Sequence, residues 1–183
     1  MIALLESIRE IVNPEFHYSY DKGDRITLVE KQDSSECNSV ILKKGSIKTF
    51  TLELDKQNNI EIHPLLSTIA ELKKKCDYVI FCQKENKFYV LVVELKSNNS
   101  TGWTKQARAG EILTRYLIGM TENFSGLNVL PFVEFRYILF NTKTRKKKKT
   151  IVKGFEYETD HKWGFRFTRK ACNSLYDLGM FLK

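Results

Sequence analysis

Two apolar stretches joined by five polar residues constrain this chain more than any other feature. Residues 76–82 and 88–95 are almost wholly apolar, whereas residues 83–87 between them are polar. A two-residue turn at Glu85-Asn86 would pair Lys84 with Lys87 and close a β-hairpin. Both faces of this hairpin would be apolar, and such a sheet must be covered on both sides. The sequence therefore predicts an α/β protein with a mixed sheet flanked by helices on both faces.

The same register places three charged side chains at one end of the hairpin. Counting back from the turn sets Tyr78 opposite Val93, and the next pair outward is Asp77 with Glu94. Because side chains alternate along a strand, Glu94 and Lys96 share one face. Opposed positions have Cβ atoms about 5 Å apart, so the two carboxylates need a compensating cation. Mg²⁺ prefers oxygen ligands and keeps several waters. A metal-activated water beside a lysine can hydrolyse a phosphodiester.

Asp77 with Glu94-x-Lys96 resembles the signature of the PD-(D/E)xK nuclease superfamily, which includes many restriction enzymes, Holliday-junction resolvases and antiviral nucleases. The motif is short, and its context of a hairpin, a loop and an amphipathic helix makes it more specific. The resemblance implies a restriction-endonuclease-like fold that binds Mg²⁺, for which Mn²⁺ can substitute. The implied metal ligands are Asp77, Glu94 and the carbonyl of Leu95, and Lys96 would be the catalytic lysine.

Two further residues match family positions on helices. Gln106 stands where the family often places a polar residue after the motif, although a hydrogen bond to the preceding loop explains it equally well. Glu71 is the candidate for an acid on a preceding helix. A solvated helix face with a Glu71–Lys75 ion pair is the favoured interpretation of Glu71.

The resemblance covers about residues 64–141 of a single domain that spans residues 1–183. The family core runs in the order helix, three strands, helix, strand. A helix predicted over Pro64–Lys75 leaves no room for the first of those strands directly before Asp77. Either that strand comes from the N-terminal region, or the helix is an insertion.

Hydrophobic periodicity and turn residues predict the remaining elements. The other expected helices are Ile2–Val12, Trp103–Met120 and a short segment from an Asn173 cap to near Leu182. The other expected strands are Arg25–Lys31, Val40–Leu42, Ile47–Leu54, Val133–Asn141 and a terminal pair, Thr150–Glu158 with Lys162–Thr168.

Positive charge is concentrated near the C-terminus. Residues 141–170 hold eleven lysines and arginines and three acids, an excess equal to the formal net charge of +8 of the whole chain. Such a segment is typical of a polyanion binder, although a charge run is also typical of a solvated hairpin tip. The candidate phosphate ligands are Lys105, Arg108, Arg145, Lys146, Lys147, Lys148 and Lys149. The alternating aromatics Trp163, Phe165 and Phe167 are interpreted as core, while Arg166 and Arg169 beside them leave base stacking open.

Four cysteines, at positions 37, 76, 82 and 172, form no Cys-x-x-Cys pair. They are interpreted as reduced thiols in a cytoplasmic protein. No apolar run approaches the roughly 20 residues of a membrane span, so no membrane partner is expected. The amphipathic start lacks the basic region of a signal peptide.

These features predict a Mg²⁺-dependent endonuclease that acts on nucleic acid. The breadth of the family favours DNA over RNA, and analogy suggests bacterial or phage defence or DNA processing. Relatives often dimerise, so a homodimer or a larger complex is open. Two alternative functions also remain: a catalytically silent nucleic-acid-binding subunit of the same fold, and a viral-type RNA endonuclease domain that would add His63 as a metal ligand.

Overall fold

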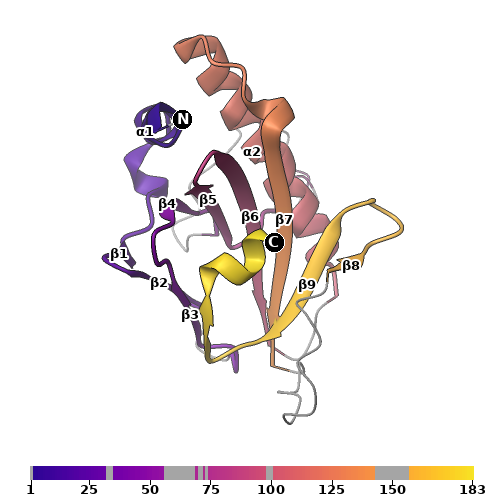
Figure 1. The fold of residues 1–183 in the computed structure, drawn as a ribbon. Coiled ribbons are helices and arrows are strands. Elements are labelled where there is room, and N and C mark those ends of the chain that lie inside the picture. The colour runs from indigo at the N-terminus through magenta and orange to yellow at the C-terminus, as the bar shows by residue number, and fades with distance from the viewer. Residues whose placement is uncertain are drawn as a thin grey trace.

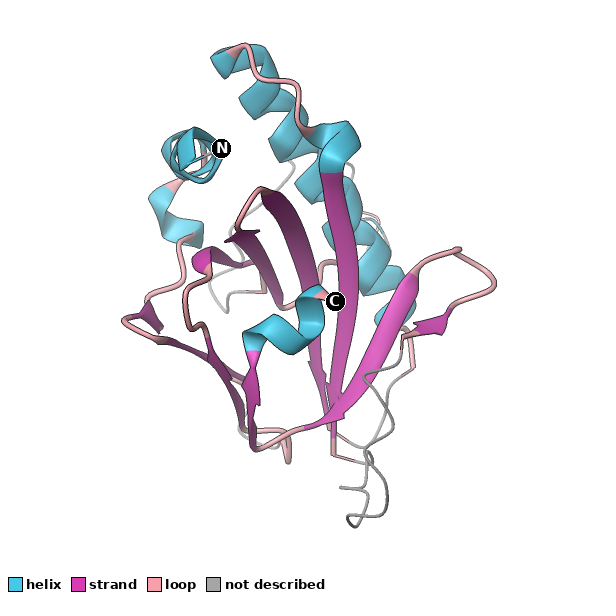
Figure 2. Cartoon of the chain, in the orientation of Figure 1, coloured by secondary structure: helices cyan, strands magenta, loops and turns pink. Residues whose placement is uncertain are grey.

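The computed structural model describes residues 2–31, 35–55, 69, 72, 74–97, 101–142 and 157–183. Within these residues the chain is a mixed α/β protein with two sheets and two α-helices (Figures 1 and 2). The larger sheet has the order β4-β5-β6-β7-β9-β8, and the smaller has the order β1-β2-β3-β10. The helices are α1 (Ile2–Ile11) and α2 (Trp103–Ser125), with short 3-10 turns at Pro14–Phe16, Leu130–Phe132 and Leu178–Leu182.

The larger sheet contains β4 (Lys48–Glu53), β5 (Tyr78–Lys84), β6 (Lys87–Lys96), β7 (Val133–Asn141), β8 (Glu158–Thr159) and β9 (Arg166–Ala171). The smaller contains β1 (Asp21–Lys22), β2 (Arg25–Val29), β3 (Ser39–Lys43) and β10 (Ser174–Asp177). β5 is antiparallel to both of its neighbours, β4 and β6, whereas β6, β7 and β9 run parallel. The parallel strands therefore end at one edge of the sheet.

The predicted hairpin register is confirmed. β5 and β6 pair Lys84 with Lys87 at the turn and Tyr78 with Val93 at the far end. Glu85, the first turn residue, has a φ of 54°, which suits a tight hairpin turn. The register thus brings the chain segment just before Tyr78 alongside the segment just after Val93.

The two faces of the larger sheet are covered differently. Both helices pack on one face, where Leu4 and Ile8 of α1 and Leu113 and Ile118 of α2 join the same core cluster. On the other face the smaller sheet and the C-terminal 3-10 turn contribute the cover (Figure 1). The prediction of helices on both faces is therefore wrong for the second face of the described residues. The physical requirement was only that apolar area be buried, and a second sheet meets it as well as helices do.

Helix α2 lies very close to the hairpin that carries the charged end. A Cβ atom at Gly110 would stand 2.4 Å from Cys76 Sγ and 3.1 Å from Val92 Cγ1. Only a glycine allows this approach, because real side-chain carbons do not come so near. The close contact fixes the middle of α2 over the strand ends that bear Asp77 and Glu94.

The inner face of α2 differs from the predicted stripe in its second half. Helical periodicity over residues 103–120 predicts an inner stripe that includes Met120 and an outer face that includes Glu111. In the structure Met120 is 45% exposed, whereas Glu111 is 3% exposed. Glu111 accepts hydrogen bonds from Arg108 and from Arg115, the latter at 2.7 Å, and from the Tyr137 hydroxyl. A buried carboxylate with this many donors is compensated, which explains why it is tolerated inside.

The C-terminal elements also differ from expectation. Asn173 does not cap a helix: its Oδ1 accepts hydrogen bonds from the backbone N–H groups of Asn38 and Ser39, at 2.9 and 3.1 Å. The strand β10 follows and pairs in parallel with β3, and a 3-10 turn comes only after it. In the terminal strand pair, β9 begins four residues later than predicted, after a turn at 161–163. The predicted partner strand lies mostly outside the described residues, as does the helix predicted over Pro64–Lys75.

A disulfide joins Cys37 and Cys172, whose Cα atoms lie 5.3 Å apart. The prediction of four reduced thiols is therefore wrong for this pair, while Cys76 and Cys82 are free and buried. The partners are 135 residues apart in sequence, so only the β3–β10 pairing brings them together. The cytoplasmic assignment, which used that interpretation, stays a prediction. Among the described residues, no helix is long and apolar enough to cross a membrane.

Reduction of this disulfide should destabilise the protein. Because the bond closes a very long loop, dithiothreitol is expected to lower the free energy of unfolding by about 2–5 kcal/mol. Thermal unfolding with and without reductant measures the change, and a Cys37→Ser/Cys172→Ser double variant should not respond. Thiol counting in non-reducing denaturant should give two free thiols, and a count of four with an unchanged melting temperature would contradict the pairing.

Candidate functional site

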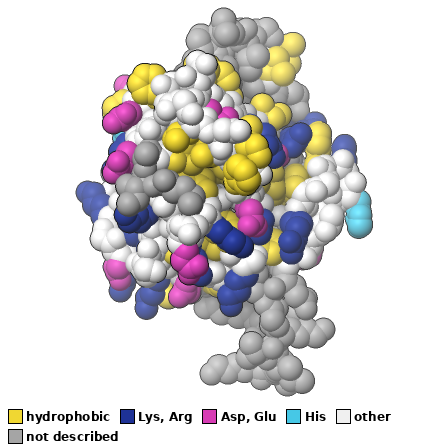
Figure 3. Space-filling view, turned by 45° about the horizontal axis from the view of Figure 1, so that its top comes forward, with side chains coloured by type: hydrophobic (Ala, Val, Ile, Leu, Met, Phe, Trp, Pro, Cys, Tyr) yellow, Lys and Arg dark blue, Asp and Glu magenta, His cyan; other side chains and the backbone are white. Residues whose placement is uncertain are grey.

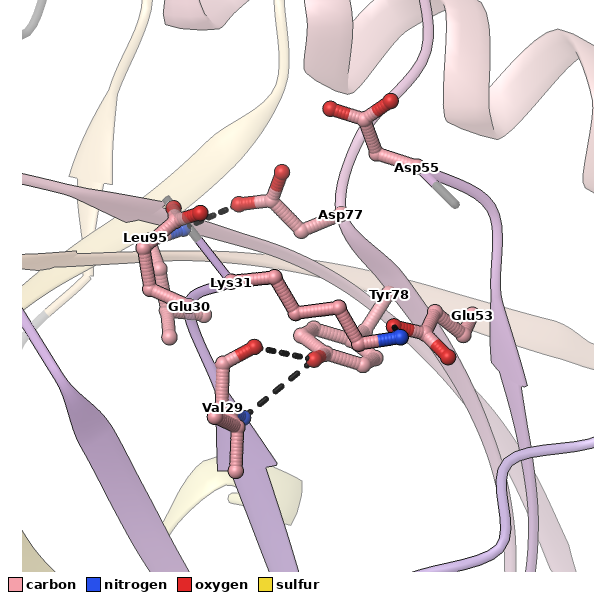
Figure 4. A pocket seen from close by; sticks show the side chains of 8 residues that line it. All are labelled: Val29, Glu30, Lys31, Glu53, Asp55, Asp77, Tyr78 and Leu95. Atoms are coloured by element: carbon pink, nitrogen blue, oxygen red, sulfur yellow. Dashed lines mark hydrogen bonds and ion pairs between the residues drawn. The ribbon is translucent and has the colours of Figure 1, made fainter. Parts of the chain in front are cut away.

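Asp77 sits at the end of the hairpin, immediately before β5. Its Oδ2 accepts a hydrogen bond of 2.6 Å from the backbone N–H of Leu95, and its own carbonyl accepts one of 2.9 Å from the N–H of Leu54 (Figure 4). The first bond crosses from β5 to β6 where the ladder ends. It fixes the Asp77 carboxylate beside the Glu94-Leu95 peptide, as the register predicted.

Glu94 is the most unusual residue of the site. The residue is 1% exposed, and among the described residues only the Lys96 ammonium group and the backbone N–H of Asp77 interact with its carboxylate as donors. Its close cationic neighbour among the described residues is Lys96, whose Nζ lies 2.5 Å from Glu94 Oε1. The Lys96 side chain is 24% exposed and so connects this buried carboxylate to solvent.

The electrostatics show that the charges at this site do not balance. Burial, followed by the nearby Asp77 charge, raises the pKa of Glu94 well above its usual range. Burial also raises the pKa of Asp77, against the lowering effects of the Leu95 N–H and of Lys96. Burial alone would lower the pKa of Lys96, but the Glu94 carboxylate raises it above its ordinary value. Two carboxylates thus share one ammonium group, and the site favours additional positive charge.

Leu95 contributes its backbone. A residue in a strand directs its N–H and C=O to the same side, as paired residues that exchange both bonds show. Since the Leu95 N–H meets Asp77, its carbonyl also faces the Asp77 side of β6, beyond the last pair of the β5–β6 ladder. An oxygen donor there directly follows Glu94 in sequence and lies on the Asp77 side of the strand in space.

A small pocket opens next to Asp77, with acids from three separate strands around it. Its lining is Val29, Glu30, Lys31, Glu53, Asp55, Asp77, Tyr78 and Leu95 (Figure 4). Lys31 Nζ lies 2.5 Å from Glu53 Oε1, and Asp55 is 3.6 Å from Lys75 Nζ. Glu30 and Asp55 both raise the pKa of Asp77 further, after burial. The negative charge of the carboxylates that line this pocket favours the binding of a cation near Asp77.

Sequence reasoning missed these pocket acids. Glu53 ends β4, while Glu30 and Asp55 follow the ends of β2 and β4. Their positions at strand ends were visible in the sequence. The signal that was lacking is the pairing of β4 with β5, which places Glu53 opposite Tyr78 and next to the site.

The other predicted site residues lie at varying distances from the metal ligands. Gln106 Nε2 donates a hydrogen bond of 3.3 Å to the carbonyl of Lys75, so it holds the segment that leads into Asp77. Lys105 is exposed one residue earlier on α2, whereas Arg108 is ion-paired with Glu111. Glu71, His63 and the basic residues Arg145, Lys146, Lys147, Lys148 and Lys149 lie outside the described residues.

The donor set can be tested against a divalent cation. Within the described part of the chain, no three His, Cys, Asp or Glu side chains gather as a metal-binding group. Mg²⁺, however, is usually held by only one or two carboxylates, with waters completing its shell. The Glu94 carboxylate, which Lys96 compensates only in part, lies beside Asp77 and the Leu95 carbonyl, and these oxygens fit such a cation.

Comparisons with known proteins do not identify the chain. No protein-family model matches it, and neither a curated protein nor a solved structure gives a match.

Replacing Glu94 by Gln should stabilise the metal-free protein. The substitution removes the uncompensated charge and leaves Asp77 and Lys96 as a balanced pair. The folded-state pKa of Glu94 is raised above the unfolded value of about 4.3. The free-energy cost of ionising Glu94 in the folded protein is therefore absent below that pH and grows as pH rises. At pH 8 in EDTA, Glu94→Gln is expected to be more stable than wild type by roughly 1–3 kcal/mol, with no difference near pH 4. Mg²⁺ or Mn²⁺ should raise the melting temperature of the wild type but not that of Glu94→Gln.

Glu111→Gln is the matched control, because Glu111 is equally buried while its pKa is lowered despite burial, by Tyr137 and the two arginines. The Glu111 carboxylate of the wild type stabilises the folded state above about pH 4.3, and this stabilisation is lost as pH falls through the lowered pKa. This variant should be less stable at pH 8 and should respond to Mg²⁺ as the wild type does. The metal-site interpretation is contradicted if Glu94→Gln is less stable than wild type in EDTA. It is also contradicted if metal raises the melting temperature of Glu94→Gln as much as that of wild type.

Proposed function

We propose that this chain is a divalent-metal-dependent nuclease that hydrolyses phosphodiester bonds, with DNA favoured over RNA. The observation that carries the proposal is the buried Glu94 carboxylate, which among the described residues has Lys96 as its one cationic partner and lies beside the second carboxylate of Asp77. An unsatisfied buried carboxylate costs free energy, and a folded chain retains it only where something compensates it. A divalent cation bound to Glu94 and Asp77 would compensate this charge and could bind a phosphate of a nucleic acid as well.

The order of elements supports a restriction-endonuclease-like core. The chain runs α1, β4, β5, β6, α2, β7 within the layer that holds the site, which is the expected order of helix, three strands, helix, strand. The first strand is β4, so it comes from the N-terminal region and the segment before Asp77 need not contain it. Under this proposal the first strand need not lie directly before Asp77, where the sequence leaves no room for it.

Each residue has a role in this proposal. Asp77, Glu94 and the Leu95 carbonyl would hold Mg²⁺ or Mn²⁺, which when bound lowers the pKa of a water and polarises the phosphoryl group. Lys96, paired with Glu94 and partly exposed, would orient the attacking water and stabilise negative charge on the phosphate. Gln106 acts as a positioning residue, because it holds the backbone at Lys75, two residues before Asp77.

Substrate binding would rely on scattered cations. On the face drawn in Figure 3, lysine and arginine side chains are interspersed with acids and do not form one patch of a single sign. Lys105 is exposed near the start of α2, and the basic run Arg145–Lys149 would add contacts distant in sequence from the motif. Such phosphate contacts position a nucleic acid without selecting its sequence. A role in defence or DNA processing, and assembly as a homodimer or larger complex, extend the proposal by analogy.

The catalytically silent alternative has less support. A binding subunit needs basic residues but does not need an uncompensated buried carboxylate, and replacing Glu94 by a neutral residue would relieve its cost. Both carboxylates and the lysine are present, so the sequence retains a complete hydrolytic set. The RNA-endonuclease alternative depends on His63 and gains no support from the described residues.

Metal-dependent cleavage of labelled single- and double-stranded DNA and RNA tests the proposal. Wild type should cleave at least one of these substrates with Mg²⁺ or Mn²⁺ and not with EDTA. Glu94→Gln and Lys96→Ala are each expected to lose about 100-fold or more in rate, because both remove groups that act on the reacting centre. Glu111→Gln, assayed below its melting temperature, should retain activity. Absence of cleavage on every substrate by folded wild type contradicts the nuclease, and so do Glu94→Gln and Lys96→Ala variants that cleave as fast as wild type.

A further inference from the structure

Arg169, on the parallel strand β9, lies in the same row of the sheet as Glu94 on β6. In the sheet register Glu94 of β6 pairs with Leu139 of β7, and Leu139 pairs with Arg169 of β9. Neighbouring strands are about 4.8 Å apart, so the Cα atoms of Glu94 and Arg169 are separated by about 10 Å. The row lies at the end of the sheet where all three strands finish.

Arg169 also lies on the same face as Glu94. The row before it joins Val92, Tyr137 and Phe167, which all pack in the core cluster beneath the helices. Because side chains alternate, residues two positions further along each strand return to that face. The Arg169 guanidinium accordingly lies 5.2 Å from the ring centre of Phe167, which is buried against Trp103 at 5.1 Å. This places Arg169 beside Glu94 and Lys96, and not on the opposite face.

The charge of Arg169 has no ionic partner among the described residues. The residue is exposed, and no carboxylate of the described chain pairs with its guanidinium. Packing on a buried aromatic ring limits the conformations of the side chain and presents its planar donors outward. A guanidinium held this way is suited to bidentate contact with phosphate.

We propose that Arg169 binds a phosphate of the nucleic acid backbone next to the one held at the carboxylate site. This inference rests on the proposed function, because it assigns the substrate contact of that same site. A cation at Asp77 and Glu94 and the guanidinium of Arg169 would together hold two phosphates of one strand across the ends of β6, β7 and β9. The contact adds affinity and orientation without reading a base.

Arg166 offers a matched control three residues away on the same strand. It is exposed, stacks at 5.2 Å on the ring of Tyr157, and pairs with no carboxylate of the described residues. The odd spacing directs it to the opposite face of β9, away from Glu94. The two arginines therefore match in charge, exposure and aromatic support, and differ in the face that they occupy.

The inference is tested by measuring the binding of fluorescein-labelled oligonucleotides, both single-stranded and duplex, of DNA and of RNA. Mg²⁺ is present, and every protein carries Lys96→Ala to block cleavage. Adding Arg169→Ala should weaken binding roughly tenfold and lower the slope of log K against log salt by about 0.7–0.9, whereas Arg166→Ala should change neither appreciably. Arg169→Lys should restore the salt slope but only part of the affinity, because lysine lacks the planar fork. Equal effects of Arg169→Ala and Arg166→Ala overturn the inference.

Cleavage by the chain with Lys96 intact separates this inference from the nuclease proposal. If wild type cleaves but Arg169→Ala and Arg166→Ala behave alike, only the role of Arg169 fails. If wild type does not cleave while Arg169→Ala still loses binding selectively, the nuclease fails and the phosphate contact stands. A wild-type chain that binds none of the oligonucleotides overturns both.

Discussion

The buried Glu94 carboxylate is the constraint on which the rest of the site depends. Removing a carboxylate from water costs several kcal/mol unless donors or opposite charge replace the lost hydration. Lys96 provides part of that replacement at 2.5 Å, but Asp77 adds a second negative charge to the same corner. Glu111 shows the contrast within the same chain, because two arginines and a tyrosine hydroxyl satisfy it fully. A structural carboxylate is compensated in this way, and Glu94 is not.

The architecture explains how these groups come together. The β5–β6 hairpin sets Asp77 against the Glu94-Leu95 peptide, and the parallel strands β7 and β9 extend the same edge. Helix α2 lies against the hairpin through the close contact at Gly110, and Gln106 anchors the chain before Asp77. On the opposite face the smaller sheet packs against the larger one, so the site lies at an edge between well-packed layers (Figure 2). The packed layers thus position Asp77, Glu94 and Lys96 at one edge of the larger sheet.

Local patterns predicted the parts of this structure that depend on near neighbours in sequence. The hairpin register followed from period-two alternation and a two-residue turn, and the bounds of α1, β3, β4 and β7 were close to those observed. Contacts between distant segments could not be derived in this way. The Cys37–Cys172 bond and the parallel β3–β10 pairing join residues about 135 positions apart. For the same reason the pocket acid Asp55 and the placement of Arg169 beside Glu94 emerged only from strand order. Glu111 was misplaced because one of its three donors, Tyr137, lies on a different element, whereas Arg108 and Arg115 lie on the same helix.

Anomalous diffraction from crystals grown or soaked with Mn²⁺ tests the metal site most directly. The proposed arrangement predicts an anomalous peak within coordination distance of the carboxylates of Asp77 and Glu94, next to the Leu95 carbonyl, with Lys96 displaced from Glu94 or shared with the metal's waters. Crystals saturated with Mn²⁺ that show no peak there, and in which Lys96 remains the sole partner of Glu94, would contradict it.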